Sequence, residues 1–570
     1  VAALSTAQVA ALSTAQVAAL TTLQIVALDT NQASILSTAQ LVSLGEDGTL
    51  ALETRDLAVM STSQISSFTT AQIQAMDTRQ IVALSTLQLS TLTTAQVSSI
   101  SASQISALTT NQVVALSTAQ VVSLSASAID SIETRDIAAF LTTQISALST
   151  AQIAQMATKQ VAALSTDQLT TLSTAQIQAL GASILGVETS DLVALLTAQI
   201  AALSTAQIAS LSTQQISSLS TEQASTLSTA QLVSLTTLQL RALQTSDVAA
   251  LTTAQISGLS TAQIQALLTS QISALATEQV VGLTTAQLSS LTSSQVTSLN
   301  LPSIENFSTA QVAAFTTNQI ENLTTTQISQ FTSNQISGLT TAQIASITTS
   351  QAAALTTEQV GALTTAQVAA LQTRDVAALT TAQVVAIETT DVSKLTTEQV
   401  QALSTAQVAV LTTNQAAQLT TAQVEALLTT QAAALTTAQV AALSTAQVRA
   451  LETRDLAALS TANIVALTTD QAVGLSTAQV AALTTAQVQA LETRDLVEMS
   501  TAQISSLSTL QSSALSSAQV VALTTTQLPN LVLTDTQIGY LTTAQTGALS
   551  TAQVAALTTA QVAAITTSNL

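Results

Sequence analysis

The residues of this chain that could carry out chemistry are concentrated in a four-residue motif. Glu53-Thr54-Arg55-Asp56 recurs three times unchanged and once with Gln in place of Glu. Three further motifs lack the Arg. The other copies and the related motifs are Glu133-Thr134-Arg135-Asp136, Glu452-Thr453-Arg454-Asp455, Glu492-Thr493-Arg494-Asp495, Gln372-Thr373-Arg374-Asp375, Glu188-Thr189-Ser190-Asp191, Gln244-Thr245-Ser246-Asp247 and Glu388-Thr389-Thr390-Asp391. Paired carboxylates can serve as general acid and base, or can supply oxygen ligands to calcium.

The rest of the sequence does not support either chemistry. Calcium binds six to eight oxygen atoms, whereas long neutral stretches separate these acidic residues. Catalysis would need partners such as a His, a Lys cluster or a Gly-rich phosphate loop, and the chain has no His and only two Lys. We therefore predict no catalytic, cofactor-binding or metal-binding residue, and no enzyme. The acidic residues fit the start of a helix, where they favour the helix dipole, and we expect each Arg to pair with carboxylates on a neighbouring coil.

The motif belongs to an eight-residue frame that runs through the whole chain. VAALSTAQ, residues 1–8, is a typical copy, and we number its positions 1 to 8 from the β-branched Val. The register breaks twice, by one missing residue at 181–183 and by a two-residue insertion at 529–533. Because a short repeat must bury its apolar face against its neighbours, we predict a single continuous octapeptide-repeat solenoid over residues 1–570.

The spacing of apolar residues within the octad predicts a helix. Positions 1 and 4 are large aliphatic residues, as in Val9 and Leu12. This i,i+3 spacing places them on one helical face, whereas in a strand they would point to opposite faces. Glycine occurs only 11 times, too few for the corners of a β-solenoid, which is the alternative fold.

One long helix is excluded, because its apolar stripe would advance by about 80° per octad. Ser or Thr at position 5 is a favoured N-cap, and with Gln at position 8 it has the spacing of a capping box. We therefore predict an all-α solenoid of very short helices, one for each octad. Matched segments 16 residues apart, Ile304–Phe307 and Ile320–Leu323, indicate a rung of two octads.

Two features have both a structural and a functional interpretation. The Gln at position 8 could form an exposed ladder of amides, but we favour a role in satisfying backbone groups at helix ends. Three of the five phenylalanines lie in the interval 300–331, at position 4. We interpret them as large core residues and keep an aromatic binding platform as the alternative.

Composition excludes several classes of function. The net charge is −20, with ten basic residues, so nucleic acid and anionic membranes are improbable partners. No run of about 18 apolar residues occurs, which excludes a membrane span in this segment. The chain contains no Cys, and it opens at Val1 without Met or a signal-peptide pattern, as expected for a piece of a longer chain.

The repeated string, as in LSTAQVAALTTAQVAAL, resembles the low-complexity repeat tracts of giant bacterial surface and secreted proteins, such as adhesin stalks and extracellular fibres. The resemblance covers the whole chain and implies an extracellular or cell-surface structural protein that forms an extended rod or filament. We expect self-association into filaments or bundles, because small apolar residues are abundant and charge is low. The alternative is an ice- or polysaccharide-binding protein that uses Thr/Ser arrays. Glycan or surface contacts, and glycosylation at Asn306 or Asn322, stay open.

Overall fold

The computed structural model describes residues 1–565, which form 68 short α-helices and two 3-10 helices and contain no strand. The helices begin at position 6 of almost every octad and are four to six residues long, as in α8 (Thr62–Ser67) and α9 (Thr70–Ala75). The prediction of an all-α solenoid with one helix per octad is confirmed, and a β-solenoid is excluded for the described residues.

Most helices start at a capping box. Before α8, Ser61 has extended backbone angles (φ −67°, ψ 159°), and its hydroxyl accepts from the backbone N–H of Gln64 at 3.3 Å. The Gln64 side-chain oxygen in turn accepts from the N–H of Ser61 at 2.8 Å. Two N–H donors that a helix start leaves unpaired are satisfied in this way. The capping box therefore stabilises helices that are too short to be stable in isolation.

Most helices end at position 2 or 3, and the chain turns at position 4 without glycine. Phe68 follows α8 in an extended conformation (φ −58°, ψ 140°), and its N–H donates to the carbonyl oxygen of Ile65. Two successive extended residues, at positions 4 and 5, make the corner. Within the described residues a positive φ occurs only at Gly45 and Gly181, so helix corners replace the glycine-rich turns of a β-solenoid.

The core consists of the residues at positions 1 and 4. Ile65 and Ile73 at position 1 are fully buried, and Phe68 and Met76 at position 4 are nearly so. Burying such a side chain contributes about 1.5–3 kcal/mol. The side chains at positions 5 to 7 face outward, which leaves the Ser and Thr residues on the surface.

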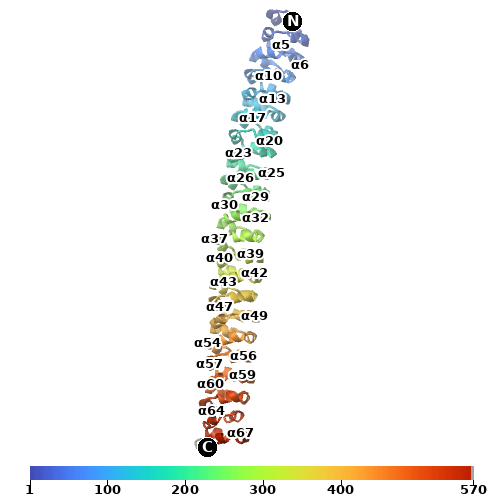
Figure 1. Ribbon diagram of the computed structural model, residues 1–570. Helices are drawn as coiled ribbons and strands as arrows, with labels where there is room; N and C mark the ends of the chain where they lie inside the picture. The colour runs from blue at the N-terminus through green and yellow to red at the C-terminus, as the bar shows by residue number, and fades with distance from the viewer. Residues whose placement is uncertain (566–570) are drawn as a thin grey trace. The chain divides into compact units, whose positions relative to one another are not determined.

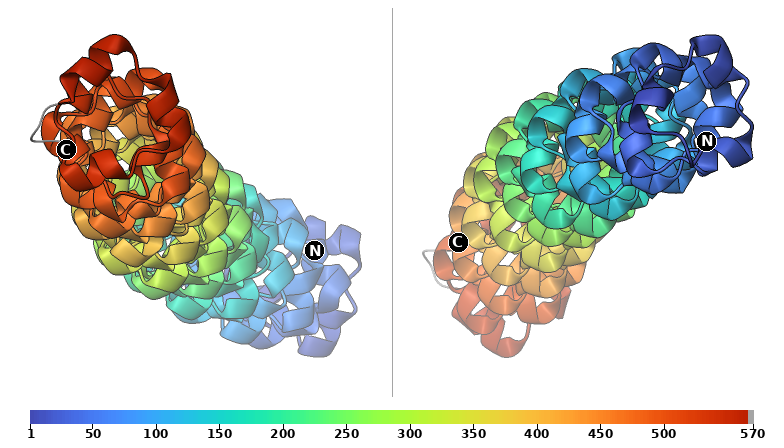
Figure 2. Two further views of the ribbon diagram at one scale, coloured as in Figure 1. Left: turned by 90° about the horizontal axis from the view of Figure 1, so that it is seen from below. Right: turned by 90° about the horizontal axis from the view of Figure 1, so that it is seen from above.

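One turn of the solenoid contains three octads. Helix α2 (Thr14–Ala18) packs against α5 (Thr38–Ser43), and α5 packs against α8, and the same step of three helices recurs along the chain. Viewed end-on, the helices of successive turns within a unit are arranged around a centre (Figure 2). The predicted two-octad rung is wrong. The number of octads in a turn depends on the angle at each corner and on packing between turns, which spacing in the sequence does not reveal.

The chain divides into two compact units, Val1–Leu283 and Thr284–Leu570. Within each unit the helices stack in successive layers (Figure 1). The same octad pattern builds both units, and a single continuous solenoid over the whole chain stays a prediction.

A 3-10 helix lies at each break of register. The first, η1 (Gly181–Gly186), takes the place of an α-helix in its turn and contacts α20 (Thr158–Val161) and α25 (Thr205–Ser210). It opens at Gly181 with φ 53° and has no side-chain cap. The second, η2 (Leu528–Asn530), contains Pro529 near its start. The Ser/Thr cap is missing at η1, whereas the octad of η2 keeps it, because the hydroxyl of Thr524 accepts from the N–H of Gln527 at 3.3 Å.

The phenylalanines at position 4 are core residues, as predicted. Phe307, Phe315 and Phe331 are all buried. The rings of Phe307 and Phe315 meet edge to face, with centroids 5.6 Å apart and an interplanar angle of 73°. This arrangement favours aromatic pairs beyond the area that they bury, and it leaves no exposed aromatic platform at these three residues.

Candidate functional site

The glutamine at position 8 is buried in most octads, and it joins successive turns. The Nε2 group of Gln104 donates to the carbonyl oxygens of Ile73 at 2.9 Å and Met76 at 2.7 Å in the turn below. Its Oε1 accepts from the N–H of Ser101 at 2.7 Å. One buried amide therefore caps its own helix and satisfies the carbonyl groups at an earlier helix end. The structural interpretation of this glutamine is confirmed, and its side chain is not an exposed ladder.

Other side chains take over the same task where glutamine is missing. Asn463 donates from Nδ2 to the carbonyl oxygen of Leu435 at 2.7 Å, 28 residues earlier. In η1, the Ser183 hydroxyl donates to the carbonyl oxygen of Met156 at 2.8 Å. The carbonyl at position 4 is thus the acceptor that each turn offers to the next, whatever donor meets it.

Six octads keep the glutamine but have no polar N-cap. At Leu141, for example, the backbone N–H still donates to Oε1 of Gln144 at 2.8 Å. The others are Ala157, Leu196, Leu268, Ala276 and Leu428. The glutamine half of the capping box is therefore more regular than the hydroxyl half.

Aspartate at position 8 reverses the direction of the bond between turns. The hydroxyl of Thr110, in the turn below, donates to Oδ1 of Asp136 at 2.6 Å. Similar bonds run from Thr166 to Asp191, Thr221 to Asp247, Thr349 to Asp375, Thr365 to Asp391, Thr429 to Asp455 and Thr469 to Asp495. These Thr residues at position 6 were not singled out from the sequence. Their constant spacing of 25 or 26 residues before each Asp could have identified them once three octads per turn were known.

In two of the octads that have Asp at position 8, an amide donor appears at position 5. In the octad with Asp375, Gln372 at position 5 donates from Nε2 to the carbonyl oxygen of Ala345 at 2.6 Å. Gln244 likewise donates to the carbonyl oxygen of Ser217 at 3.2 Å. A carboxylate has no donor, so in these two octads position 5 supplies the amide that position 8 has lost, whereas the other six have Glu at position 5 and no amide there.

The arginine of the motif pairs within its own octad. Arg55 Nε lies 2.7 Å from Glu53 and 3.7 Å from Asp56. The same pairing with Glu and Asp recurs at Arg135, Arg454 and Arg494, and Arg374 pairs with Asp375. The predicted ion pair with a neighbouring coil is therefore wrong. The guanidinium group of Arg55 also contacts the turn below, where its Nη2 donates to the carbonyl oxygen of Leu28 at 3.5 Å.

The aspartates lie deeper than the other members of the motif. Asp56 and Asp375 have no exposed side-chain surface, whereas Arg55 is 58% exposed. Loss of hydration on burial raises the pKa of Asp56, opposed by Arg55, and raises the pKa of Asp375, opposed by Arg374. Within residues 1–565, the acidic side chains form no group of three or more that could hold a metal ion.

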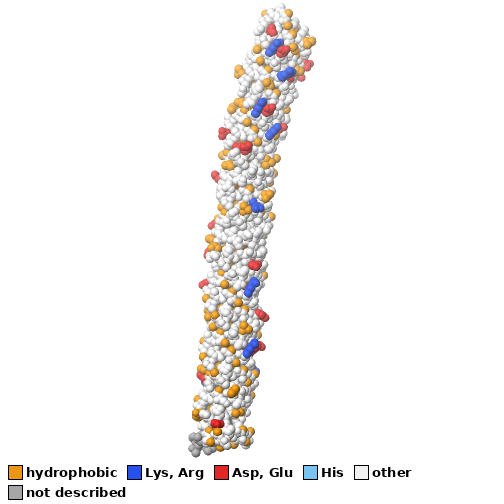
Figure 3. Space-filling model, in the orientation of Figure 1, with side chains coloured by type: hydrophobic (Ala, Val, Ile, Leu, Met, Phe, Trp, Pro, Cys, Tyr) orange, Lys and Arg blue, Asp and Glu red, His pale blue; other side chains and the backbone are white. Residues whose placement is uncertain are grey.

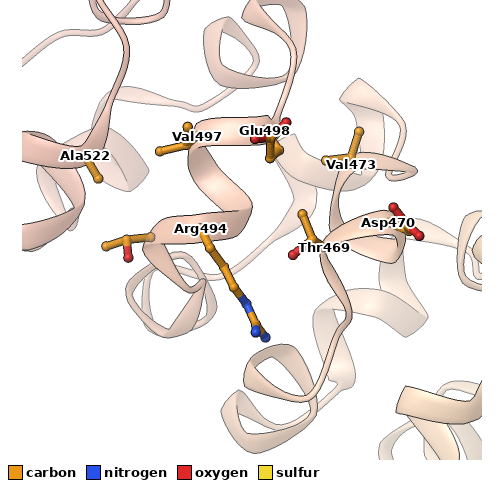
Figure 4. A pocket seen from close by; sticks show the side chains of 8 residues that line it. Thr469, Asp470, Val473, Arg494, Val497, Glu498 and Ala522 are labelled. Carbon is orange, nitrogen blue, oxygen red and sulfur yellow. The ribbon is translucent and has the colours of Figure 1, made fainter.

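The surface carries few charges, and most cationic groups lie beside carboxylates (Figure 3). An open depression of about 680 Å³ lies in the second unit, between α58 (Thr469–Val473) and α61 (Thr493–Glu498). Asp470, Arg494 and Glu498 line it together with Thr and aliphatic side chains (Figure 4). Because Arg494 already pairs with Glu492 and Asp495, the depression offers no free cation to an anionic ligand.

The Ser and Thr side chains at positions 5 and 6 of the octad have different environments. At position 5 the hydroxyl is an N-cap acceptor, as for Thr69 with the N–H of Gln72 at 3.2 Å. At position 6 the Thr side chain is mostly exposed, as at Thr70. Asn306 and Asn322 are exposed, and each side-chain amide donates to a carbonyl oxygen of its own helix.

None of the helices in residues 1–565 combines the length and the apolar character that a bilayer crossing requires. No curated protein matches the chain. Ten segments match the family model of the ALTTAQ repeat, and together they cover more than half of the sequence: residues 1–30, 50–86, 129–166, 184–221, 240–277, 328–365, 368–405, 384–421, 448–485 and 488–525. The six letters of that repeat appear unchanged as residues 250–255, where Thr252 caps α31 (Thr253–Gly258) and Gln255 completes the box. The chain is therefore a tandem-repeat protein that belongs to the ALTTAQ repeat family.

Proposed function

We propose that this chain is a non-enzymatic structural protein that spans distance as an extended rod or as part of a filament. The observation that carries the proposal is the glutamine bond between turns, which each turn repeats with its neighbours inside each unit. Because every turn binds the next in the same way, adding octads adds length without changing the cross-section. The buried glutamine side chains thus hold turns together rather than face a ligand.

Electron microscopy of the purified chain, combined with small-angle scattering, tests this function. At 24 residues per turn, the 283 residues of the first unit make about 12 turns. With about 8–10 Å between packed helices, that unit alone should measure about 100–120 Å along its axis. Particles of this length or more, with a constant width, are the expected result. Particles no longer than they are wide would contradict the proposal.

We further propose that the chain works outside the cell, at a surface or in a fibre, and that copies associate side by side. Support for association comes from large apolar side chains in the outer positions, such as Leu23 and Leu510, which are 82% and 76% exposed. The absence of Cys and the resemblance to repeat tracts of bacterial surface proteins support the location. Surface labelling of intact cells tests the location, and light scattering at rising protein concentration tests association.

The ice- or polysaccharide-binding alternative needs rows of free hydroxyl groups. In most Ser/Thr pairs one of the two hydroxyl groups, the one at position 5, caps a helix, as at Thr69. This use of the hydroxyl favours the structural role. Thermal hysteresis and glycan pull-down measurements separate the two, and activity in either would support the alternative.

A further inference from the structure

Four of the aspartates at position 8 have side-chain oxygens that are buried without a hydrogen bond. Within residues 1–565, buried side-chain oxygens without a hydrogen bond are Oδ1 and Oδ2 of Asp56, Oδ2 of Asp375, Asp455 and Asp495, and the hydroxyl of Thr546. A buried carboxylate is costly unless it is fully paired. The aspartates therefore place a carboxylate at position 8, where most octads have the neutral amide of glutamine.

Asp375 shows the clearest example. It lies on α46 (Thr373–Ala378), which packs against α43 (Thr349–Ala354) and α49 (Thr397–Ala402). Its Oδ1 accepts from the hydroxyl of Thr349 at 3.3 Å and lies 3.5 Å from Nε of Arg374, which is 60% exposed. Helix α43 carries no charged residue, and α49 carries Glu398 at its exposed second position. One partly solvated arginine thus faces a fully buried carboxylate.

Asp56 lies in a more acidic setting. It is on α7 (Thr54–Val59), between α4 (Thr30–Ser34) and α10 (Thr78–Ala83). The N-cap of α4 is Asp29, and α10 brings Asp77 and Arg79. Its own octad adds Glu53 and Arg55. Burial is the main cause that raises the pKa of Asp56, Arg55 opposes it, and the carboxylates of Glu53 and Asp29 add to it.

We propose that Asp56 and Asp375 make the solenoid stronger in acid, so that the turns containing them hold together more tightly as the pH falls from neutral. Protonation removes the buried charge and provides an O–H donor in the place where the glutamine amide normally donates.

The direction of this pH effect follows from the difference in pKa between the folded and unfolded states. Burial raises the pKa of Asp56 and Asp375 in the folded chain, so the folded state binds a proton at a pH where the unfolded state has lost it. The destabilising contribution is therefore fully present at neutral pH, falls as the pH drops through the raised pKa, and is gone below the ordinary value of about 3.9.

Thermal unfolding of the whole chain, followed by circular dichroism at constant ionic strength, tests the proposal. Asp375→Asn removes the charge and keeps the shape. We expect its melting temperature to exceed that of the wild type by on the order of 2 °C at pH 7.5, and the two values to converge near pH 4. The control is Asp535→Asn, which removes an exposed aspartate from the first helical residue of α65 (Asp535–Ile538). This change should produce no such gain at neutral pH.

A second variant rebuilds the usual octad. Gln372→Thr combined with Asp375→Gln gives Thr-Thr-Arg-Gln, close to the natural Asp77-Thr78-Arg79-Gln80. It should also be more stable than the wild type at pH 7.5 and should lose this advantage in acid. If both variants differ from the wild type by the same amount at pH 4 and pH 7.5, or both are less stable at pH 7.5, the proposal is wrong.

Discussion

Gln40 in α5 donates from its side-chain amide to the carbonyl oxygen of Leu12 at 2.7 Å, 28 residues earlier and in the turn below. The same amide oxygen accepts from the N–H of Ser37 at the start of its own helix. One side chain therefore couples the formation of a helix to its docking on the previous turn. Isolated helices of five or six residues do not persist in water, so this coupling makes each octad depend on its neighbours.

Removing one of these amides should weaken the array. Gln215→Leu keeps the side-chain size but leaves the N–H of Ser212 and the carbonyl oxygen of Val187 without their partners at 2.9 and 2.8 Å. We expect a loss of about 1–3 kcal/mol in the free energy of unfolding, the usual cost of unpaired buried groups, measured by urea denaturation. The neighbouring Gln214 is exposed, so Gln214→Leu is the control and should have little effect. Equal effects of the two changes would disprove the role of the buried amide.

Adding a missing cap should strengthen the array. Ala276 occupies an N-cap with φ −68° and ψ 158°, the geometry of the serine caps, but it has no hydroxyl. Ala276→Ser should therefore stabilise the chain by about 1 kcal/mol. The same substitution at the exposed Ala254, inside α31, is the control. A gain at both positions, or at neither, would show that the hydroxyl half of the box contributes nothing here.

The local structure could be predicted from the sequence, but the contacts between turns could not. The cap at Ser61 and the buried face of Ile65 and Phe68 depend on residues within one octad, where spacing and propensity are sufficient. The number of octads per turn depends on corner angles that no residue type specifies. For that reason the two-octad rung and the Arg55 pairing were wrong, and the partner of each Asp at position 8 was missed.

The break at η1 should respond very differently to two glycine substitutions. A Cβ on Gly186 would lie 2.2 Å from the carbonyl oxygen of Thr158 and 3.0 Å from the N of Ala162, in the turn below. Gly181 has a φ of 53° but open space around the new atom. Gly186→Ala should cost about 3 kcal/mol because backbones must separate, and Gly181→Ala about 1 kcal/mol through backbone strain alone. Urea denaturation measures both, and the opposite order would contradict the close packing of η1 on α20.

Glu358 should give a pH dependence opposite to that of the buried aspartates. It lies at the second residue of α44 (Thr357–Gly361), where its own backbone N–H and the hydroxyls of Thr356 and Thr357 lower its pKa. A lowered pKa means that the stabilising contribution is present above the unfolded value and is lost as the pH falls through the folded value. Glu358→Gln should therefore reduce the melting temperature at pH 7 and have no effect in strong acid. The control is Glu425→Gln at the exposed last residue of α52 (Thr421–Glu425). If both variants change stability equally at pH 7, hydrogen bonds at the helix start are not the cause of the effect.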